Sequence, residues 1–195
     1  MEYITKTNLI LPFKGVWVVG NGGRDPNTNN HQNPNGTGPK DQKYAYDFVS
    51  VKVKNKGKNL EDYEAFGAEV ICPGDGVVSQ VIDGSLDVPI GERDNYVLSG
   101  NRVVIDHTNG EWSVICHLKQ NSIKVKVGDK VKQGDLLGLC GNSGNTSEPH
   151  IHYQLQDGSD INKATGVPAQ FVRIIVDEAL KENYEPIRGE KVSSP

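Results

Sequence analysis

Short apolar stretches alternate with polar positions along most of the chain, with the period of two that is typical of β-strands. The clearest case is Asn101–Leu118, where two alternating segments flank Asn109-Gly110, a dipeptide typical of tight hairpin turns. Residues 69–83 predict two further strands, and Tyr44–Val53 predicts another. Val125–Gly141 repeats the strand, Gly-Asp, strand pattern of residues 69–83. These patterns predict a mostly antiparallel β fold.

Two stretches lack this alternation and predict long loops. Gly20–Lys43 is rich in Gly, Asn and Pro and contains His31, and residues 84–101 form the second loop. Long loops inside a compact domain are usually functional or disordered. In the mixed tail from Asp160, the β-branched cluster of "AQFVRIIVDEALKE" favours extended structure in its first half. Nothing marks a boundary, so residues 1–195 are predicted to form a single domain.

The composition supports this fold class and excludes some functions. Hydrophobic residues make up 35% and there are 22 glycines, which favours many short strands joined by tight turns over a helical bundle. The net charge of −4 offers no basic footprint for nucleic acid. The three cysteines form no CxxC pair, which predicts buried free thiols. We see no signal peptide and no stretch long enough to span a bilayer.

Two of the five histidines stand one residue apart in "EPHIHYQLQ", residues 148–156. On a strand, His150 and His152 share one face with Gln154 and Gln156, whereas the residues between them face the core. The two imidazoles are then about 7 Å apart along the strand. An HxH pattern alone is as consistent with a solvated surface as with a metal site.

A third histidine, His117, lies in the predicted strand Trp112–Leu118. Simple alternation places Cys116 and His117 on opposite faces, which argues against a Cys–His dyad. A lone strand histidine is more often a hydrogen-bonded structural residue than a functional one. His107 lies beside the hairpin turn, where we expect it to be exposed and uninvolved.

Asp47 is the unusual residue of the strand Tyr44–Val53, because its face also holds Ala45, Val49 and Val51. A buried carboxylate requires a cation, a metal ion or several hydrogen bonds. Asp47 is therefore one of two things. It is either a structural carboxylate that accepts hydrogen bonds from backbone N–H groups or from an Arg side chain, or it is a metal ligand.

The segments "YAYDF", "VICHL" and "VKVGDKVKQGDLLGLCGNSGNTSEPHIHYQLQ" together resemble the M23 family of zinc metallopeptidases, of the lysostaphin and LytM type with its duplicated hybrid motif. Each motif alone is weakly specific, but their common order is highly specific. The resemblance covers about residues 12–157 and leaves the tail, 160–195, packed on the domain or accessory to it. It implies a mostly β, single antiparallel sheet domain with long loops.

Residue by residue, the resemblance implies a site with one Zn²⁺ per chain. His152 and Asp47 match metal ligands of the family. His150 matches a catalytic histidine facing the metal-bound water, and His117 matches the second catalytic histidine. The remaining ligand is assigned to His31.

The His31 assignment departs from the common family pattern. Most members place this ligand four positions before the aspartate, as H-x-x-x-D, whereas this chain has Lys43 there. The nearest upstream histidine is His31, sixteen positions before Asp47. A branch of the family resembles this chain in having a longer spacing before a Tyr-Ala-x-Asp-Phe strand.

The implied function is a zinc endopeptidase that hydrolyses peptide bonds, with bacterial peptidoglycan as the expected substrate. Two His and one Asp leave an open position on a tetrahedral zinc, as in catalytic sites. His150 and His117 would act as general base and oxyanion stabiliser. No HExxH motif is present, so a glutamate base is not expected.

Two other readings of the sequence remain open at this point. One is a non-catalytic M23-like module that binds cell-wall peptide or a protein partner. The other is a carrier domain, because "VKVGDKVKQGDLLG" also resembles lipoyl, biotinyl and sugar-phosphotransferase IIA domains. This alternative fits less well, since Met1 is the only methionine and IIA domains lack HxH. The family resemblance implies a cell-envelope or secreted location.

Overall fold

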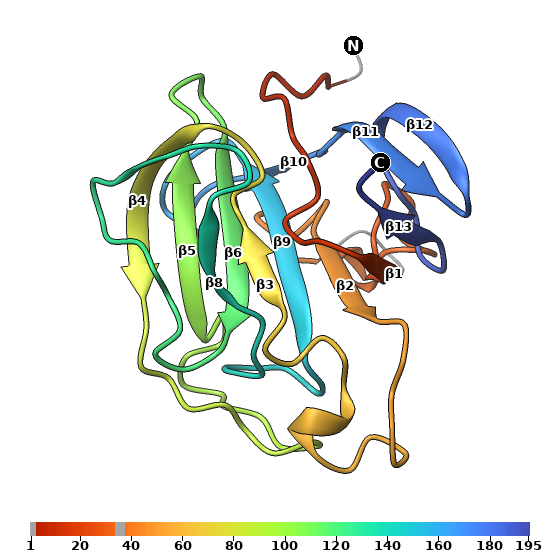
Figure 1. Ribbon diagram of the computed structural model, residues 1–195. Coiled ribbons are helices and arrows are strands. Elements are labelled where there is room, and N and C mark those ends of the chain that lie inside the picture. The colour runs from red at the N-terminus through yellow and green to blue at the C-terminus, as the bar shows by residue number, and fades with distance from the viewer. Residues whose placement is uncertain (1–2, 34–37) are drawn as a thin grey trace.

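The computed structural model describes residues 3–33 and 38–195, and its regular secondary structure is almost entirely β-strand (Figure 1). The elements are β1 (Val16–Asn21), η1 (Asn30–Gln32), β2 (Tyr46–Ser50), η2 (Leu60–Asp62), β3 (Glu69–Ile71), β4 (Gly76–Ile82), β5 (Asn101–Asp106), β6 (Trp112–Leu118), β7 (Lys130–Val131), β8 (Leu136–Leu139), β9 (His150–Gln156), β10 (Gly166–Val167), β11 (Phe171–Val176), β12 (Ala179–Tyr184) and β13 (Lys191–Ser193), where η denotes a 3-10 helix. The predicted fold class is confirmed.

One antiparallel sheet of eleven strands dominates the molecule. Its order is β12-β11-β13-β1-β2-β9-β6-β5-β4-β7, with β10 paired to β9. A second, two-stranded sheet of β3 and β8 lies in front of it (Figure 1). The centre of the large sheet, β2-β9-β6, carries four of the five predicted site residues, so hydrogen-bonded ladders set their relative positions.

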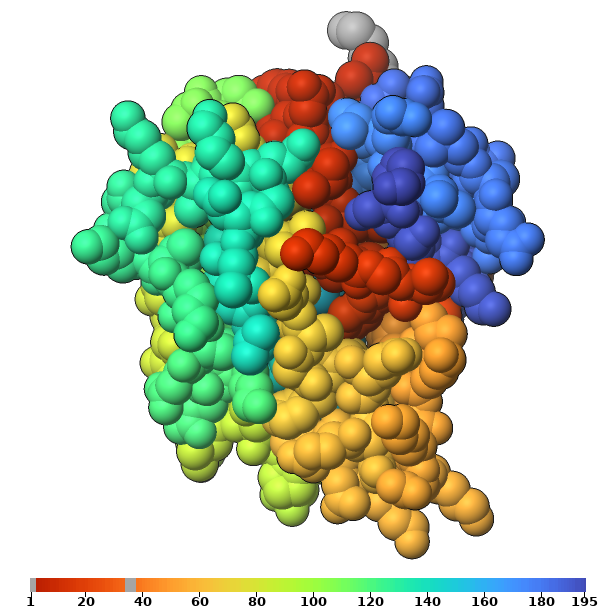
Figure 2. All heavy atoms as spheres, viewed as in Figure 1, coloured from red at the N-terminus to blue at the C-terminus, as the bar shows by residue number. Residues whose placement is uncertain are grey.

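The hydrophobic core lies between the large sheet and the layer that contains β3 and β8. Phe48, Ile115 and Ile151, on the three central strands, are fully buried in this core together with Leu137 of β8. In Figure 2 the segments around β3 and β8, together with the N-terminal segment, cover the front of the sheet. The opposite face of β2, β9 and β6 is therefore the one available for a site.

The observed strands agree with most of the sequence-based predictions. β5 and β6 form the predicted hairpin, and Cys72, Cys116 and Cys140 are buried and free as expected. The tail segment "AQFVRIIVDEALKE" is extended in its first half, as predicted, and its second half forms β12. Of the predicted loop Gly20–Lys43, residues 34–37 lie outside the described part of the chain.

Candidate metal centre

A groove of about 830 Å³ lies on the face of the large sheet opposite the core. Its volume is typical of a ligand-binding site. The side chains that line it include all five predicted site residues, which are His31, Asp47, His117, His150 and His152. The structure thus brings these residues together, although they span more than half of the chain.

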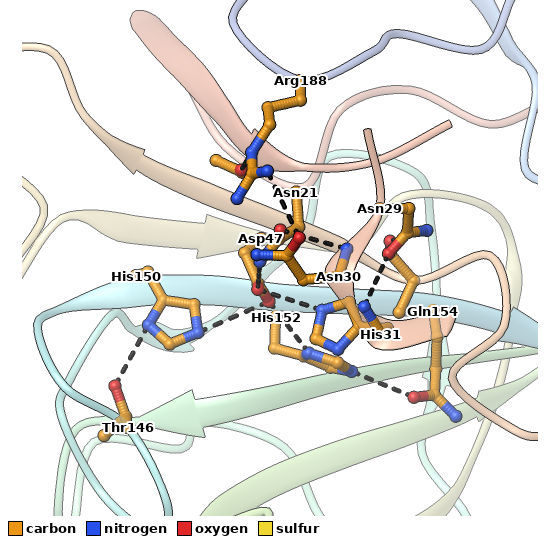
Figure 3. A network of polar contacts seen from close by, with 12 residues as sticks. Asn21, Asn29, Asn30, His31, Asp47, Thr146, His150, His152, Gln154 and Arg188 are labelled. Atoms are coloured by element: carbon orange, nitrogen blue, oxygen red, sulfur yellow. Dashed lines mark hydrogen bonds and ion pairs between the residues drawn. The ribbon is translucent and has the colours of Figure 1, made fainter. Parts of the chain in front are cut away.

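The ladder between β2 and β9 places Asp47 directly beside His152. His152 Nδ1 lies 3.0 Å from Asp47 Oδ1, and His150 Nε2 lies 3.5 Å from the same oxygen (Figure 3). Both histidines face the groove, as the alternation along β9 predicts. The HxH pattern therefore delivers two imidazoles to one buried carboxylate.

His31 reaches the same carboxylate from η1, a short turn in the long loop. The fully buried Asn29 side chain holds this turn, since its Nδ2 donates to the carbonyls of Gly23 (3.1 Å) and Ala45 (3.2 Å). Asn29 Oδ1 accepts from His31 N at 3.1 Å. As a result, His31 Nε2 lies 2.9 Å from Asp47 Oδ2 despite the long separation in sequence.

A second set of polar contacts ties this turn to β1 and to the C-terminal segment (Figure 3). Asn21 Nδ2 donates to Asp47 Oδ2 at 2.7 Å, and Asn21 Oδ1 accepts from Asn30 N at 3.4 Å. Arg188 donates to Asn30 Oδ1 (3.2 Å) and to the carbonyl of Gly20 (2.9 Å). Sequence reasoning missed Asn21 and Arg188, because no local pattern distinguishes them from other surface residues.

His31, Asp47 and His152 have the geometry of a metal site. Each offers one ligand atom, and these atoms lie within 4.8 Å of one another. Although His31 Nε2 is close to Asp47, it is buried and has no partner with hydrogen-bond geometry among the described residues. A buried nitrogen without a hydrogen-bond partner is explained if its lone pair points to a metal ion that His31 shares with Asp47 and His152. Two His and one Asp are a donor set that suits zinc.

The carboxyl group of Asp47 is in the ionised form that metal binding requires. Burial alone would raise its pKa, but the contacts from His150, His152 and His31 outweigh burial and hold the pKa well below its ordinary value. The residues present therefore fit a zinc ion.

His117 enters the groove through an irregular backbone. Its φ is +61°, and the register between β5 and β6 shifts next to it. The backbone N–H donates to the carbonyl of Ser99, and Nδ1 lies 2.8 Å from the carbonyl oxygen of Ser143. Since the Ser143 oxygen can only accept, Nδ1 carries the proton and Nε2 is left as the free ring nitrogen.

The prediction that Cys116 and His117 point to opposite faces is wrong, because both line the groove. Positive φ at His117 interrupts the strand alternation on which that prediction rested. Burial raises the pKa of the Cys116 thiol to about 12. The thiol therefore stays protonated and is not a nucleophile at neutral pH.

His150 is oriented in the same way as His117. Its Nδ1 lies 2.8 Å from the carbonyl oxygen of Glu148 and 3.1 Å from Thr146 Oγ1, which leaves Nε2 on the groove side. The ring centroids of His117 and His150 are 4.8 Å apart. Two imidazoles thus stand side by side next to the candidate metal centre.

Burial lowers the pKa of His117 well below its ordinary value, and the neighbouring His150 and His152 lower it further. Burial also acts to lower the pKa of His150, but the hydrogen bond and charge of Asp47 raise it above the ordinary value. In this arrangement His117 is neutral at pH 7.

The loop between β8 and β9 supplies the carbonyl groups that orient both rings. Gly144 in this loop has φ +88°, and a Cβ there would lie 2.4 Å from Gly100 N. Glycine is therefore required for the close approach that places the neighbouring Ser143 carbonyl against His117. The sequence Gly-Asn-Ser-Gly, residues 141–144, lies within the segment that resembles the M23 family, but that resemblance did not reveal the role of the carbonyl groups.

His107 corrects another expectation. It is buried rather than exposed, with Nδ1 2.8 Å from the carbonyl oxygen of Asp75 and Nε2 2.7 Å from Ser113 Oγ. Residues distant in sequence, such as Asp75, cover the end of the β5–β6 hairpin. The local turn sequence could not show that this end would be buried. His107 does not line the groove and is a structural residue.

Comparison with known proteins places these features in a family context. The model of peptidase family M23 matches residues 55–163, a segment that contains His117, His150 and His152 but not His31 or Asp47. The peptidoglycan DD-endopeptidases ShyA and ShyC of Vibrio cholerae are 38% identical over 46% of this chain and 30% identical over 67%. The chain spans only 17% and 30% of the length of these two relatives.

Solved structures show the same fold. A zinc-containing peptidase from Vibrio cholerae superposes with a TM-score of 0.51 at 20% identity, over 85% of this chain and 41% of that one. The M23 metalloprotease pseudoalterin, from the deep sea, superposes with a TM-score of 0.51 at 18% identity, over 92% of this chain and 86% of that one.

Proposed function

The chain belongs to peptidase family M23, and from that premise we propose that it is a zinc-dependent endopeptidase that cleaves peptide bonds of bacterial peptidoglycan. The observation that carries the proposal is the convergence of His31, Asp47 and His152 beside two further histidines in one groove. Three protein ligands and adjacent proton-transfer groups are the components that hydrolysis by a metallopeptidase requires.

One zinc ion would be held by His31 Nε2, a carboxylate oxygen of Asp47 and His152 Nδ1, which are the atoms that face one another in the groove. When bound, zinc lowers the pKa of water from 15.7 to about 7 and polarises a carbonyl oxygen. Asn21 Nδ2 holds the Asp47 carboxylate from the other side and limits its rotation.

His117 and His150 act at their Nε2 atoms, because a backbone carbonyl oxygen engages each Nδ1. A neutral Nε2 can take a proton from the attacking water, and a protonated Nε2 can donate a hydrogen bond to the oxyanion of the tetrahedral intermediate. The two rings, 4.8 Å apart, are close enough to serve one scissile bond as general base and oxyanion stabiliser.

A peptide of the bacterial cell wall is the substrate class that the relatives support, since ShyA and ShyC are peptidoglycan DD-endopeptidases. The same names support a location at the cell envelope. Among the described residues, no helix is long and apolar enough to cross a membrane.

We also propose that residues 1–195 act as a single domain. The tail strands β11 and β13 pair with each other, and β13 pairs with β1, which continues into the groove-bearing part of the sheet. Arg188 in the tail contacts the turn that holds His31. Limited proteolysis that released the tail as a separately stable fragment would contradict this proposal.

The decisive experiment measures zinc per chain together with hydrolysis of purified peptidoglycan. We expect one zinc per chain and release of peptide fragments, both abolished by a chelator and restored by added zinc. Zinc binding and wall binding without fragment release would instead indicate a non-catalytic binding module.

A further inference from the structure

The groove face of β9 continues beyond His152 with two glutamines that the proposed mechanism does not use. Gln154 is 3% exposed and Gln156 is fully buried. Burying an amide is costly unless its polar atoms are hydrogen-bonded. Both amides meet this requirement within one chain of contacts that begins at His152. Figure 3 shows its first link, between His152 and Gln154.

The chain has three links. His152 Nε2 lies 3.0 Å from Gln154 Oε1, Gln154 Nε2 donates to Gln156 Oε1 at 2.7 Å, and Gln156 Nε2 donates to the carbonyl of Gly158 at 2.6 Å. The three side chains follow one another at alternate positions along the strand, so the pleat of β9 holds their spacing.

The last hydrogen bond of the chain, to the carbonyl oxygen of Gly158, determines which group donates and which accepts in every other link. A backbone carbonyl oxygen can only accept, so the Gly158 oxygen requires the NH₂ group of Gln156. The Gln156 oxygen is then left to accept from Gln154, and the Gln154 oxygen is left to accept from His152. A neutral His152 ring therefore carries its proton on Nε2, and its Nδ1 lone pair, 3.0 Å from the acceptor oxygen Asp47 Oδ1, is accommodated by a cation shared with that carboxylate.

We propose that Gln154 and Gln156 are positioning residues for the metal ligand His152: they hold its Nε2–H so that the Nδ1 lone pair is directed at the metal centre. This inference rests on the proposed function, in which His152 Nδ1 is a ligand. Hydrogen-bond acceptors behind a ligating histidine determine its tautomer and ring orientation, and their loss typically weakens metal binding by about 10- to 100-fold.

Gln156 acts at one remove, through the orientation of the Gln154 amide. Without its oxygen, nothing along the strand would favour the Gln154 orientation that points oxygen at His152 over the flipped one that points NH₂ at it. In the flipped orientation the NH₂ group of Gln154 would face the Nε2–H of His152, so that two hydrogen-bond donors would point at each other. Loss of Gln156 should therefore weaken zinc binding in the same direction as loss of Gln154, but less.

The experiment uses the full chain and four variants. Gln154→Met and Gln156→Met remove an acceptor at similar side-chain volume, and Gln154→Glu keeps an acceptor for His152. The matched control is Gln133→Met, whose amide also donates to backbone carbonyls, but outside the groove. Zinc affinity is measured by chelator competition, and nitrogen-15 NMR of the zinc-loaded protein detects the His152 Nε2–H.

We expect a slowly exchanging Nε2–H signal of His152 in the unsubstituted chain and in Gln154→Glu. Gln154→Met should lose this protection and bind zinc about 10- to 100-fold more weakly. Gln156→Met should show a smaller loss, and Gln133→Met none.

Two results would overturn the inference while leaving the proposed function intact. One is a chain that binds zinc and hydrolyses peptidoglycan but whose His152 shows no protected Nε2–H. The other is equal zinc affinity in Gln154→Glu and Gln154→Met, which would assign the glutamine a packing role only. If the unsubstituted chain bound no zinc, the proposed function itself would fail, and the inference with it. The NMR result on the unsubstituted chain decides the matter even if Gln154→Met fails to fold.

Discussion

Two regions of the molecule supply the candidate metal ligands and hold them by different means. His152 lies on β9, in the middle of a ladder between β2 and β6. His31 lies in a three-residue turn of a long loop, held by side chains rather than by a ladder. A strand positions its ligand through backbone pairing that many sequences can provide, whereas a loop depends on a few specific contacts, chiefly those of Asn29. The loop half should therefore be easier to weaken without unfolding the protein.

Removing a ligand from either half should have the largest effect. We expect His152→Ala and His31→Ala to lose bound zinc and, with it, hydrolysis of peptidoglycan, since a buried carboxylate and one imidazole are a poor zinc site. Elemental analysis of zinc per chain tests this. His107→Asn, which removes a histidine outside the groove, should retain the metal. Unchanged zinc in His31→Ala would refute the loop half of the site.

Removing the histidines that lie beside the metal centre separates chemistry from metal binding. His117→Ala and His150→Ala should keep one zinc per chain and lose about 10²- to 10⁴-fold in hydrolysis rate, the usual contribution of a general acid–base group. Rates and zinc content measured on the same samples test this. Loss of zinc in His150→Ala with retention in His152→Ala would reverse the two assignments within HxH.

Weakening the loop half indirectly should have a smaller effect. Asn29→Ala removes the hydrogen bonds that hold the His31 turn, and we expect zinc affinity to fall about tenfold, as for other residues that support a ligand. Chelator competition provides the measurement. Asn27→Ala, an exposed asparagine of the same loop, is the control and should bind zinc like the unsubstituted chain. Equal affinities of the two variants would show that Asn29 does not hold the ligand.

The smallest effect concerns the stability of the fold and involves His107, which lies outside the groove. Burial lowers the pKa of His107 below its ordinary value of 6.5, so the unfolded chain binds the proton more readily than the folded one. The free energy of unfolding should therefore be highest above pH 6.5 and fall as the pH drops below it. Denaturant unfolding at pH 8 and pH 5.5 should show a smaller difference in His107→Asn than in the unsubstituted chain. An equal pH dependence in the two chains would contradict this.

Most of the strand half could be predicted from the sequence because alternation is a local property. The positions of Phe48 and Ile151 in the core, and of Asp47 and His152 on the opposite face, follow from the period of two along their strands. The hairpin of β5 and β6 follows from its Asn-Gly turn. The resemblance of the HxH and CHL segments to the M23 family likewise depends only on order along the chain.

The loop half has no such periodicity, so its geometry could not be derived in advance. The family resemblance nominated His31, but the sequence alone contained nothing that specified how an asparagine two residues earlier would fasten the turn to Gly23 and Ala45. The burial of His107 was missed for the same reason, because its partner Asp75 is remote in sequence.

The sequence by itself determined which strands form, which side chains each strand directs away from the core, and to which family the chain belongs. Only the tertiary structure decided that His117 turns into the groove beside Cys116, since its positive φ depends on contacts with Ser99 and Ser143 on other segments. It also decided that His31 meets Asp47, and that the glutamines of β9 form a directed chain ending at Gly158. Alternation is imposed by the backbone of each strand, whereas these features arise from hydrogen bonds between segments that only the folded chain brings together.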